Sequence, residues 1–161
     1  MSPSIGKMGQ PLAPTALHEK NDVLGVDHVG LTVPNLEKSK DFFEKVLGFK
    51  VVGGDEEYPS IFLSNGHTRI TLWQVNNQKA IVEFDRTKNI GLHHLAFGVS
   101  SFEVLDGLYE QVRIYPGIIV EFSPELNSDG PAKHMMFYEP GGNRIELIHR
   151  PSEPQSSRQN Q

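Results

Sequence analysis

Val26-Asp27-His28-Val29-Gly30-Leu31-Thr32-Val33 and Leu92-His93-His94-Leu95-Ala96-Phe97-Gly98-Val99 are two versions of one strand sequence, and their recurrence decides the fold. A second pair of stretches recurs in the same order, since Gly66-His67-Thr68-Arg69-Ile70-Thr71-Leu72 resembles Gly141-Gly142-Asn143-Arg144-Ile145-Glu146-Leu147. His28 therefore corresponds to His94, and Thr71 corresponds to Glu146. Such a repeat predicts two similar modules, and these four positions converge if the modules pair about a pseudo-twofold axis.

Each half of the chain has the pattern of a βαβββ module. Alternating apolar residues predict the first strand of each half, at 25–33 and 92–99. Helical spacing follows, ended by Gly48 in the first half and begun by a Ser100–Glu103 capping box in the second. The remaining strands are predicted at 49–53, 58–64, 68–75, 118–123, 132–138 and 143–149.

We therefore predict an α+β fold in which two paired βαβββ modules form an eight-stranded, mixed, open barrel-like sheet. Module one covers residues 23–75 and module two covers residues 91–150, with a polar linker at 76–90. Neither half is large enough to bury its sheet alone, so one domain at 23–150 is expected. Residues 1–22 and 151–161 lack a sustained apolar pattern and are expected to be disordered or extended.

Composition excludes several classes of function. The net charge is −5 and no two Lys or Arg residues are adjacent, which argues against a nucleic-acid partner. The chain has no cysteine, so any metal would be held by nitrogen and oxygen ligands. Without an apolar stretch of membrane-spanning length or a secretory signal pattern, we expect a cytoplasmic protein with no membrane partner.

Two histidines and one glutamate form a candidate metal site. His28 and His94 lie on equivalent strands, and Glu146 lies between two apolar residues, where an unpaired carboxylate would cost several kcal/mol. A set of two imidazoles and one carboxylate suits Fe(II) best, with Mn(II), Zn(II), Co(II) or Ni(II) as other candidates. The structural alternative is an ion pair between Glu146 and Arg144, two residues away on the same face.

Further residues are candidates for catalysis or substrate binding. His134 is expected on the cavity face of its strand, where it would transfer protons, although an exposed strand-end histidine is an equal alternative. His93 points to the opposite face from His94 and is assigned to packing or a surface hydrogen bond. The candidates for contact with a small-molecule substrate are Thr71, Trp73, Arg69 and Tyr138.

The sequence resembles the vicinal oxygen chelate superfamily, which includes glyoxalase I, extradiol dioxygenases, and fosfomycin- and bleomycin-resistance proteins. The resemblance is carried by residues 26–29, 42–49, 92–97 and 137–147. It implies paired βαβββ modules around a divalent metal, with ligands at His28, His94 and Glu146, and a homodimer.

Two departures from the family pattern bear on the reaction. Glyoxalases have a glutamate at the position of Thr71, and extradiol enzymes have a tyrosine at that of Met136, a further candidate for substrate contact. The leading expectation is a metal-dependent enzyme, a non-haem Fe(II) dioxygenase, acting on a small metal-chelating substrate. The alternatives are a glyoxalase-type lyase or isomerase, favoured if a carboxylate such as Glu56 or Glu83 lies near Thr71, and a non-catalytic drug-binding protein.

Overall fold

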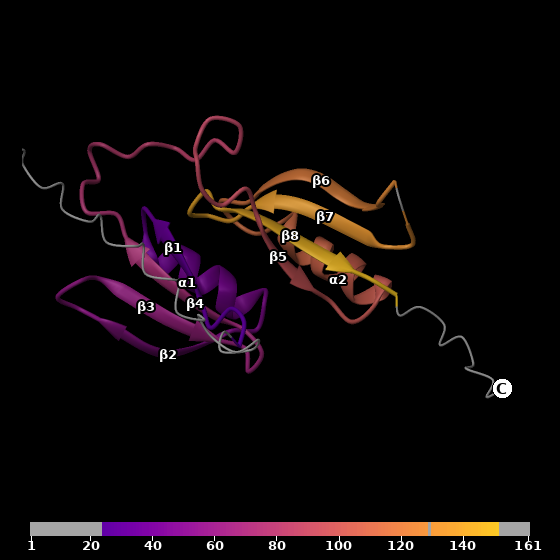
Figure 1. The fold of residues 1–161 in the computed structure, drawn as a ribbon, viewed down its shortest axis with the longest axis horizontal. Helices are drawn as coiled ribbons and strands as arrows, with labels where there is room; N and C mark the ends of the chain where they lie inside the picture. Colours follow the sequence, from indigo (N-terminus) through magenta and orange to yellow (C-terminus); the bar gives the residue numbers. More distant parts are fainter. Residues whose placement is uncertain (1–23, 129, 152–161) are drawn as a thin grey trace, which may run out of the picture.

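The computed structural model describes residues 24–128 and 130–151, which form two βαβββ modules side by side (Figure 1). Module one consists of β1 (Val29–Val33), α1 (Leu36–Lys45), β2 (Lys50–Asp55), β3 (Ser60–Ser64) and β4 (Arg69–Gln74). Module two consists of β5 (Leu95–Gly98), α2 (Phe102–Val112), β6 (Ile119–Leu126), β7 (Lys133–Tyr138) and β8 (Arg144–His149). The α+β class and the paired modules are confirmed. The disorder predicted at 1–22 and at 152–161 lies outside the described residues.

The eight strands form two four-stranded sheets with the same topology. Their orders are β1-β4-β3-β2 and β5-β8-β7-β6. In each sheet the first strand is parallel to its neighbour and the other pairs are antiparallel, so each sheet is mixed. The register confirms the internal repeat, because Gly30 pairs with Thr71 as Ala96 pairs with Glu146.

Side-chain capping starts both helices. The Asn35 side chain accepts a hydrogen bond from the Lys38 backbone amide at 3.0 Å, which satisfies a free N–H of the first turn of α1. In α2 the cap is Ser101, whose hydroxyl accepts from the Val104 backbone amide at 3.2 Å, so the predicted cap at Ser100 is wrong by one residue. Neither described helix is long and apolar enough to cross a membrane.

The first strand of each module begins later than predicted. β1 starts at Val29 and β5 at Leu95, so His28 and His94 immediately precede their strands instead of lying within them. Strand pairing explains the late start of β1 and β5. Val29 pairs with Ile70 and Leu95 pairs with Ile145, and the partner strands β4 and β8 begin only one residue before these pairs. The two histidines nevertheless keep equivalent positions.

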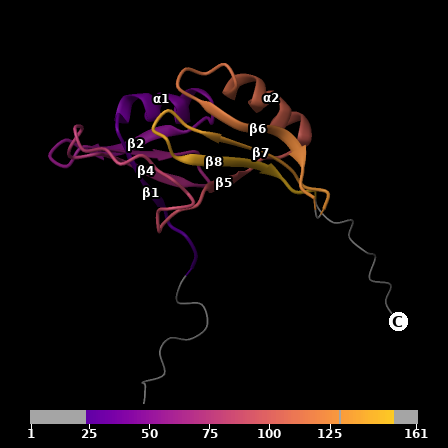
Figure 2. The same cartoon turned by 90° about the horizontal axis from the view of Figure 1, so that it is seen from above.

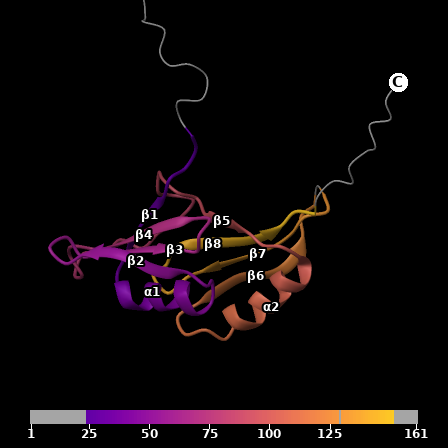
Figure 3. The same cartoon turned by 90° about the horizontal axis from the view of Figure 1, so that it is seen from below.

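Both helices lie on one side of the two sheets, and the described helices leave the opposite faces uncovered (Figures 2 and 3). We call these uncovered faces the open faces. Helix α1 also joins the modules, because the Phe42 ring packs edge-on against Phe137 at 5.7 Å and Phe43 against Phe97 at 6.5 Å between centroids. The apolar core is therefore continuous between the modules on the helix side.

Candidate functional site

Strand register brings three of the predicted site residues together on module two. Met136 on β7 pairs with Glu146, and Glu146 pairs with Ala96 on β5. Because Ile145 and Leu147 are buried in the core, alternation directs Glu146 to the open face. His134 lies two residues before Met136 and therefore shares that face.

Glu146 is a nearly buried carboxylate held between two imidazoles. Its Oε2 atom is 3.1 Å from Nε2 of His94, and its Oε1 atom is 2.6 Å from Nδ1 of His134. The whole residue is only 8% exposed, so these contacts offset the cost of removing a charge from water. The alternative ion pair between Arg144 and Glu146 is not formed, because the Arg144 guanidinium binds both oxygens of Glu121, at 2.7 and 2.9 Å.

The spacing of His94 and Glu146 fits two ligands of one cation. Two ligand atoms that each lie about 2.1 Å from a cation, at right angles, are about 3.0 Å apart. The 3.1 Å between His94 Nε2 and Glu146 Oε2 matches that separation. His134 then bonds the second carboxylate oxygen, as residues that orient a metal ligand commonly do. We call His94, Glu146 and His134 the module-two half-site.

Module one carries the equivalent half-site, made of Asp27, His28, Arg69, Thr71 and Trp73. These residues line a pocket of about 390 Å³, together with apolar residues of β2, β3 and β4. The Trp73 indole N–H donates to the Thr71 hydroxyl at 2.9 Å, which leaves the threonine O–H free to donate to a ligand. Thr71 and Trp73 thus lie in one pocket with His28, as a substrate-binding role requires.

One carboxylate lines the same pocket as Thr71, and it belongs to neither Glu56 nor Glu83. Asp27 lines the same pocket, and its carboxylate is 2.9 Å from Nδ1 of His28. The hydrogen bond from His28 lowers the pKa of Asp27, so this carboxylate is ionised at neutral pH. Glu83 instead lines a separate cavity beside the linker.

The two half-sites are not joined within the described chain. Residues 24–128 and 130–151 contain no group of three or more His, Asp or Glu side chains arranged to hold a metal ion. His94 and Glu146 are adjacent, as predicted, whereas His28 contacts Asp27 and lies in the pocket of module one. A single chain thus places two of the predicted ligands together and the third in another pocket.

A β-bulge adds two residues to the open face of module two that the sequence did not reveal. The register of β6 against β7 shifts between Val120 and Phe122, so Glu121 and Phe122 both face the site. The Phe122 ring lies 5.0 Å from the His134 ring, and Glu121 bonds Arg144. Regular alternation would have put these neighbours on opposite faces, and no sequence signal marks the bulge.

His93 also lies at this site and not in the core. Its Nδ1 atom is 2.8 Å from Nδ1 of His94 and 3.4 Å from Nη1 of Arg144. Partial desolvation and the positive charge of Arg144 lower the pKa of His93, so its imidazole is neutral at pH 7. The prediction that His93 points to the opposite face from His94 is therefore wrong, because the two rings meet on the same side.

Comparison with known proteins gives two epimerases among the relatives of this chain. It is 28% identical over 151 residues to a 2-epi-5-epi-valiolone epimerase from Actinomyces sp, covering 80% of this chain and 81% of that protein. It is also 28% identical over 134 residues to the mitochondrial methylmalonyl-CoA epimerase of Bos taurus, covering 76% of this chain and 72% of that protein.

Solved structures share the fold. A glyoxylase/bleomycin resistance protein/dioxygenase domain from Frankia sp. EAN1pec superposes with a TM-score of 0.67 at 24% identity, covering 82% of this chain and 96% of that domain. The second structure is a variant of the fosfomycin resistance protein FosX from Listeria monocytogenes, solved with Mn(II) and 1S,2S-dihydroxypropylphosphonic acid. It superposes with a TM-score of 0.63 at 19% identity, covering 79% of this chain and 92% of that protein.

The family assignment rests on the match to a family model. The model of the Glyoxalase/Bleomycin resistance protein/Dioxygenase superfamily matches residues 25–147, which includes both modules and both half-sites. The chain therefore belongs to this superfamily, the vicinal oxygen chelate proteins, as the repeated modules and the paired half-sites indicate.

Proposed function

We propose that this chain is a divalent-metal-dependent epimerase or isomerase that moves a proton at a carbon next to a carbonyl group. Its substrate is a small molecule that chelates the metal through two neighbouring oxygens. The observation that carries the proposal is Glu146, with one carboxylate oxygen beside His94 and the other bonded to His134. Such a group can bind a cation and a proton-transferring imidazole at once.

The reaction type differs from the leading expectation of a dioxygenase. Both relatives reported above are epimerases, and Asp27 supplies the carboxylate near Thr71 that favours an isomerase. Epimerisation needs no oxidant, because a base removes the proton from one face of the carbon and an acid returns a proton to the other. A redox-inactive cation serves as well as Fe(II), so Mn(II), Zn(II), Co(II) and Ni(II) remain candidates.

Each residue has a defined part in this proposal. His94, Glu146 and His28 would hold the cation, which would supply a Lewis acid that stabilises negative charge on the substrate. His134 removes or returns the proton on the module-two side, oriented by its 2.6 Å contact with Glu146. Asp27 acts from the module-one side of the carbon, and Thr71 and Trp73 position the substrate.

A homodimer would complete the site. Since His28 lies apart from the module-two half-site within one chain, we propose that module one of each copy faces module two of the other. A twofold axis makes this exchange reciprocal, so a dimer contains two equivalent sites. The uncovered faces of both sheets are the surfaces that would enclose them (Figure 2).

Metal analysis of purified protein tests the proposal directly. We expect about one divalent cation per chain in the wild type, and a loss of at least about tenfold in cation affinity in Glu146→Gln. Glu56→Gln removes an exposed carboxylate in the β2–β3 turn and is the matched control. Equal metal contents in the wild type and Glu146→Gln would contradict the metal site.

Hydrogen exchange tests the reaction. In D₂O we expect the metal-loaded protein to exchange the acidic C–H proton of methylmalonyl-CoA or 2-epi-5-epi-valiolone, measured by proton NMR. Exchange with either compound supports an epimerase. Oxygen uptake with a catechol, and no exchange with either ketone or thioester, would instead support the dioxygenase.

A further inference from the structure

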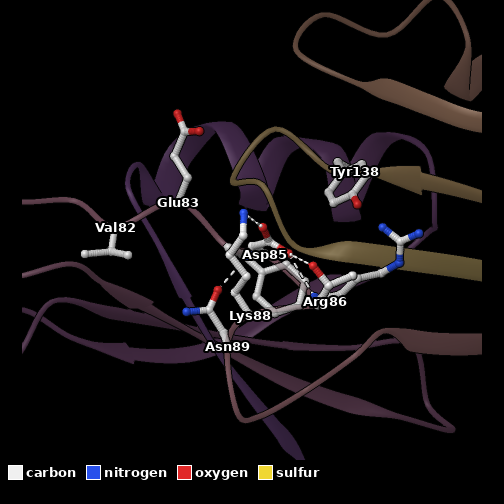
Figure 4. Close-up of a pocket in the computed structure, with 9 residues that line it drawn as sticks. Val82, Glu83, Asp85, Arg86, Lys88, Asn89 and Tyr138 are labelled. Carbon is white, nitrogen blue, oxygen red and sulfur yellow. Dashed lines mark hydrogen bonds and ion pairs between the residues drawn. The ribbon is translucent and has the colours of Figure 1, made fainter.

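A cavity of about 640 Å³ lies beside the linker, next to the module-two half-site. Its walls are residues 82–89 of the linker and Tyr138 at the end of β7 (Figure 4). This volume lies within the range of small-molecule sites in proteins. The metal ligands His94 and Glu146 do not line it, so the proposed chemistry leaves the cavity without a role.

The guanidinium group of Arg86 shares its carboxylate partner with a second guanidinium group. Nη2 of Arg86 is 3.4 Å from Oε1 of Glu121, but both oxygens of that carboxylate already accept shorter hydrogen bonds from Arg144, at 2.7 and 2.9 Å. One carboxylate therefore serves two guanidinium groups, which leaves one net positive charge.

The other charged groups that line the cavity are Glu83, Asp85 and Lys88. Asp85 binds Lys88 at 2.7 Å and also accepts from the Thr87 hydroxyl at 2.6 Å. Figure 4 shows the Arg86 side chain extending away from this pair toward the Tyr138 ring, and the Glu83 carboxylate pointing away from both. Arg86 and Tyr138 thus face each other across this end of the cavity, and the Glu121 carboxylate lies beside both.

The cavity end lies close to the proposed metal position. Tyr138 pairs with Arg144, and Met136 pairs with Glu146. The two pairs are two residues apart along β7 and β8, so their side chains lie on the same open face of the sheet. Two residues along a strand span about 7 Å. A small molecule that chelates a cation at His94 and Glu146 could therefore extend as far as Tyr138 and Arg86.

We propose that Arg86 and Tyr138 bind an oxyanion group, a carboxylate or a phosphate, at the end of the substrate remote from the metal. The guanidinium donates two N–H groups and the phenol donates its O–H, which together match the geometry of such a group. The substrate class is then a metal-chelating carbonyl compound with a second, anionic end. This inference rests on the proposed function for the chelating end only.

Titration calorimetry with inorganic phosphate and with acetate tests the oxyanion subsite. Arg86→Gln should weaken binding of the preferred anion at least about tenfold, as expected for loss of a charge-assisted hydrogen bond. Tyr138→Phe should weaken it by a smaller factor. Glu121→Gln should tighten binding severalfold, because the carboxylate that competes for Arg86 is gone. Tighter binding of phosphate identifies a phosphorylated substrate, and tighter binding of acetate a carboxylated one.

The matched control is Lys88→Gln, which removes an equal charge from the same cavity while Asp85 loses its partner. It should leave anion affinity within about twofold of the wild type, as expected for an exposed pair. The Glu146→Gln variant should still bind the anion, and the double variant Glu146→Gln/Arg86→Gln should lose this binding. That result would show that the oxyanion subsite is distinct from the metal site. Equal affinity of the wild type and Arg86→Gln, or an equal loss in Lys88→Gln, would overturn the inference.

Discussion

At the residue scale, the proposed function makes Glu146 the side chain that would connect metal binding with proton transfer. Its two oxygens face different partners, His94 at 3.1 Å and His134 at 2.6 Å. If His134 transfers the proton and His94 binds the cation, replacing each imidazole should change a different measurement. This separation is what distinguishes a catalytic base from a group that only supports a ligand.

We expect His134→Gln to keep the metal and to lose most of the activity. The glutamine amide can still donate a hydrogen bond to Glu146, so the cation content should stay within about twofold of the wild type. Proton exchange should fall by about 10²- to 10⁴-fold, since glutamine has no group that titrates near neutral pH. Loss of metal in proportion to activity would show that His134 only supports the ligand.

The Arg144–Glu121 pair makes a pH-dependent contribution to stability. The hydrogen bonds from Arg144 lower the pKa of Glu121 below its ordinary value of 4.5. Because the unfolded chain has the ordinary pKa, the pair stabilises the folded state above that value. This contribution falls as the pH drops through the lowered pKa of the folded state.

The measurement is urea unfolding between pH 3 and pH 7. Glu121→Gln should lower the free energy of unfolding by about 1–3 kcal/mol at pH 7, because Arg144 loses a charged acceptor. The difference from the wild type should shrink as the pH falls below 4.5. Glu125→Gln, on the same strand, is the matched control, and a difference independent of pH would contradict the assignment.

At the element scale, the β7–β8 turn fixes Glu146 in space. Glu139, 1% exposed, accepts hydrogen bonds from the Ser39 hydroxyl of α1 at 2.8 Å and the Gly141 amide at 2.7 Å. The Asn143 backbone and side chain donate to its other oxygen, at 3.1 and 2.9 Å. The turn is thereby attached to module one, and strand β8 starts from a fixed point.

Gly141→Ala should disrupt this attachment. A Cβ at that position would lie 2.5 Å from Glu139 Oε1 and 2.7 Å from Ser39 Oγ. We expect the free energy of unfolding to fall by about 1–3 kcal/mol, as in other overpacked sites, measured by urea unfolding. Gly107→Ala, within α2 and without a neighbour within 4 Å, should show no loss. Equal stabilities of the two variants would rule out the crowding.

At the scale of the whole molecule, the separation of the half-sites is the reason for the dimer proposed above. Each module presents its half-site on an open face, and the modules contact each other through α1 and the core on the helix side. Two copies related by a twofold axis would each supply His28 to the other's His94 and Glu146.

Co-expression of two inactive variants tests this assembly. His28→Ala and Glu146→Gln homodimers should each lack both metal sites. In a mixed dimer one site carries both substitutions and the other carries neither, so about a quarter of wild-type metal and activity should return in an equal mixture. If each site is built within one chain, mixing restores nothing.

The sequence by itself determined the module order, the repeat and the face on which Glu146 and His134 lie. These follow from residue alternation and from turn residues close together along the chain, which act locally. Only the tertiary structure decided that Glu146 also meets His134, that Arg144 binds Glu121, and that His28 contacts Asp27 apart from His94. The first two contacts depend on the β7–β8 register and on a bulge in β6, the third on how the two modules pack, and no local pattern encodes them.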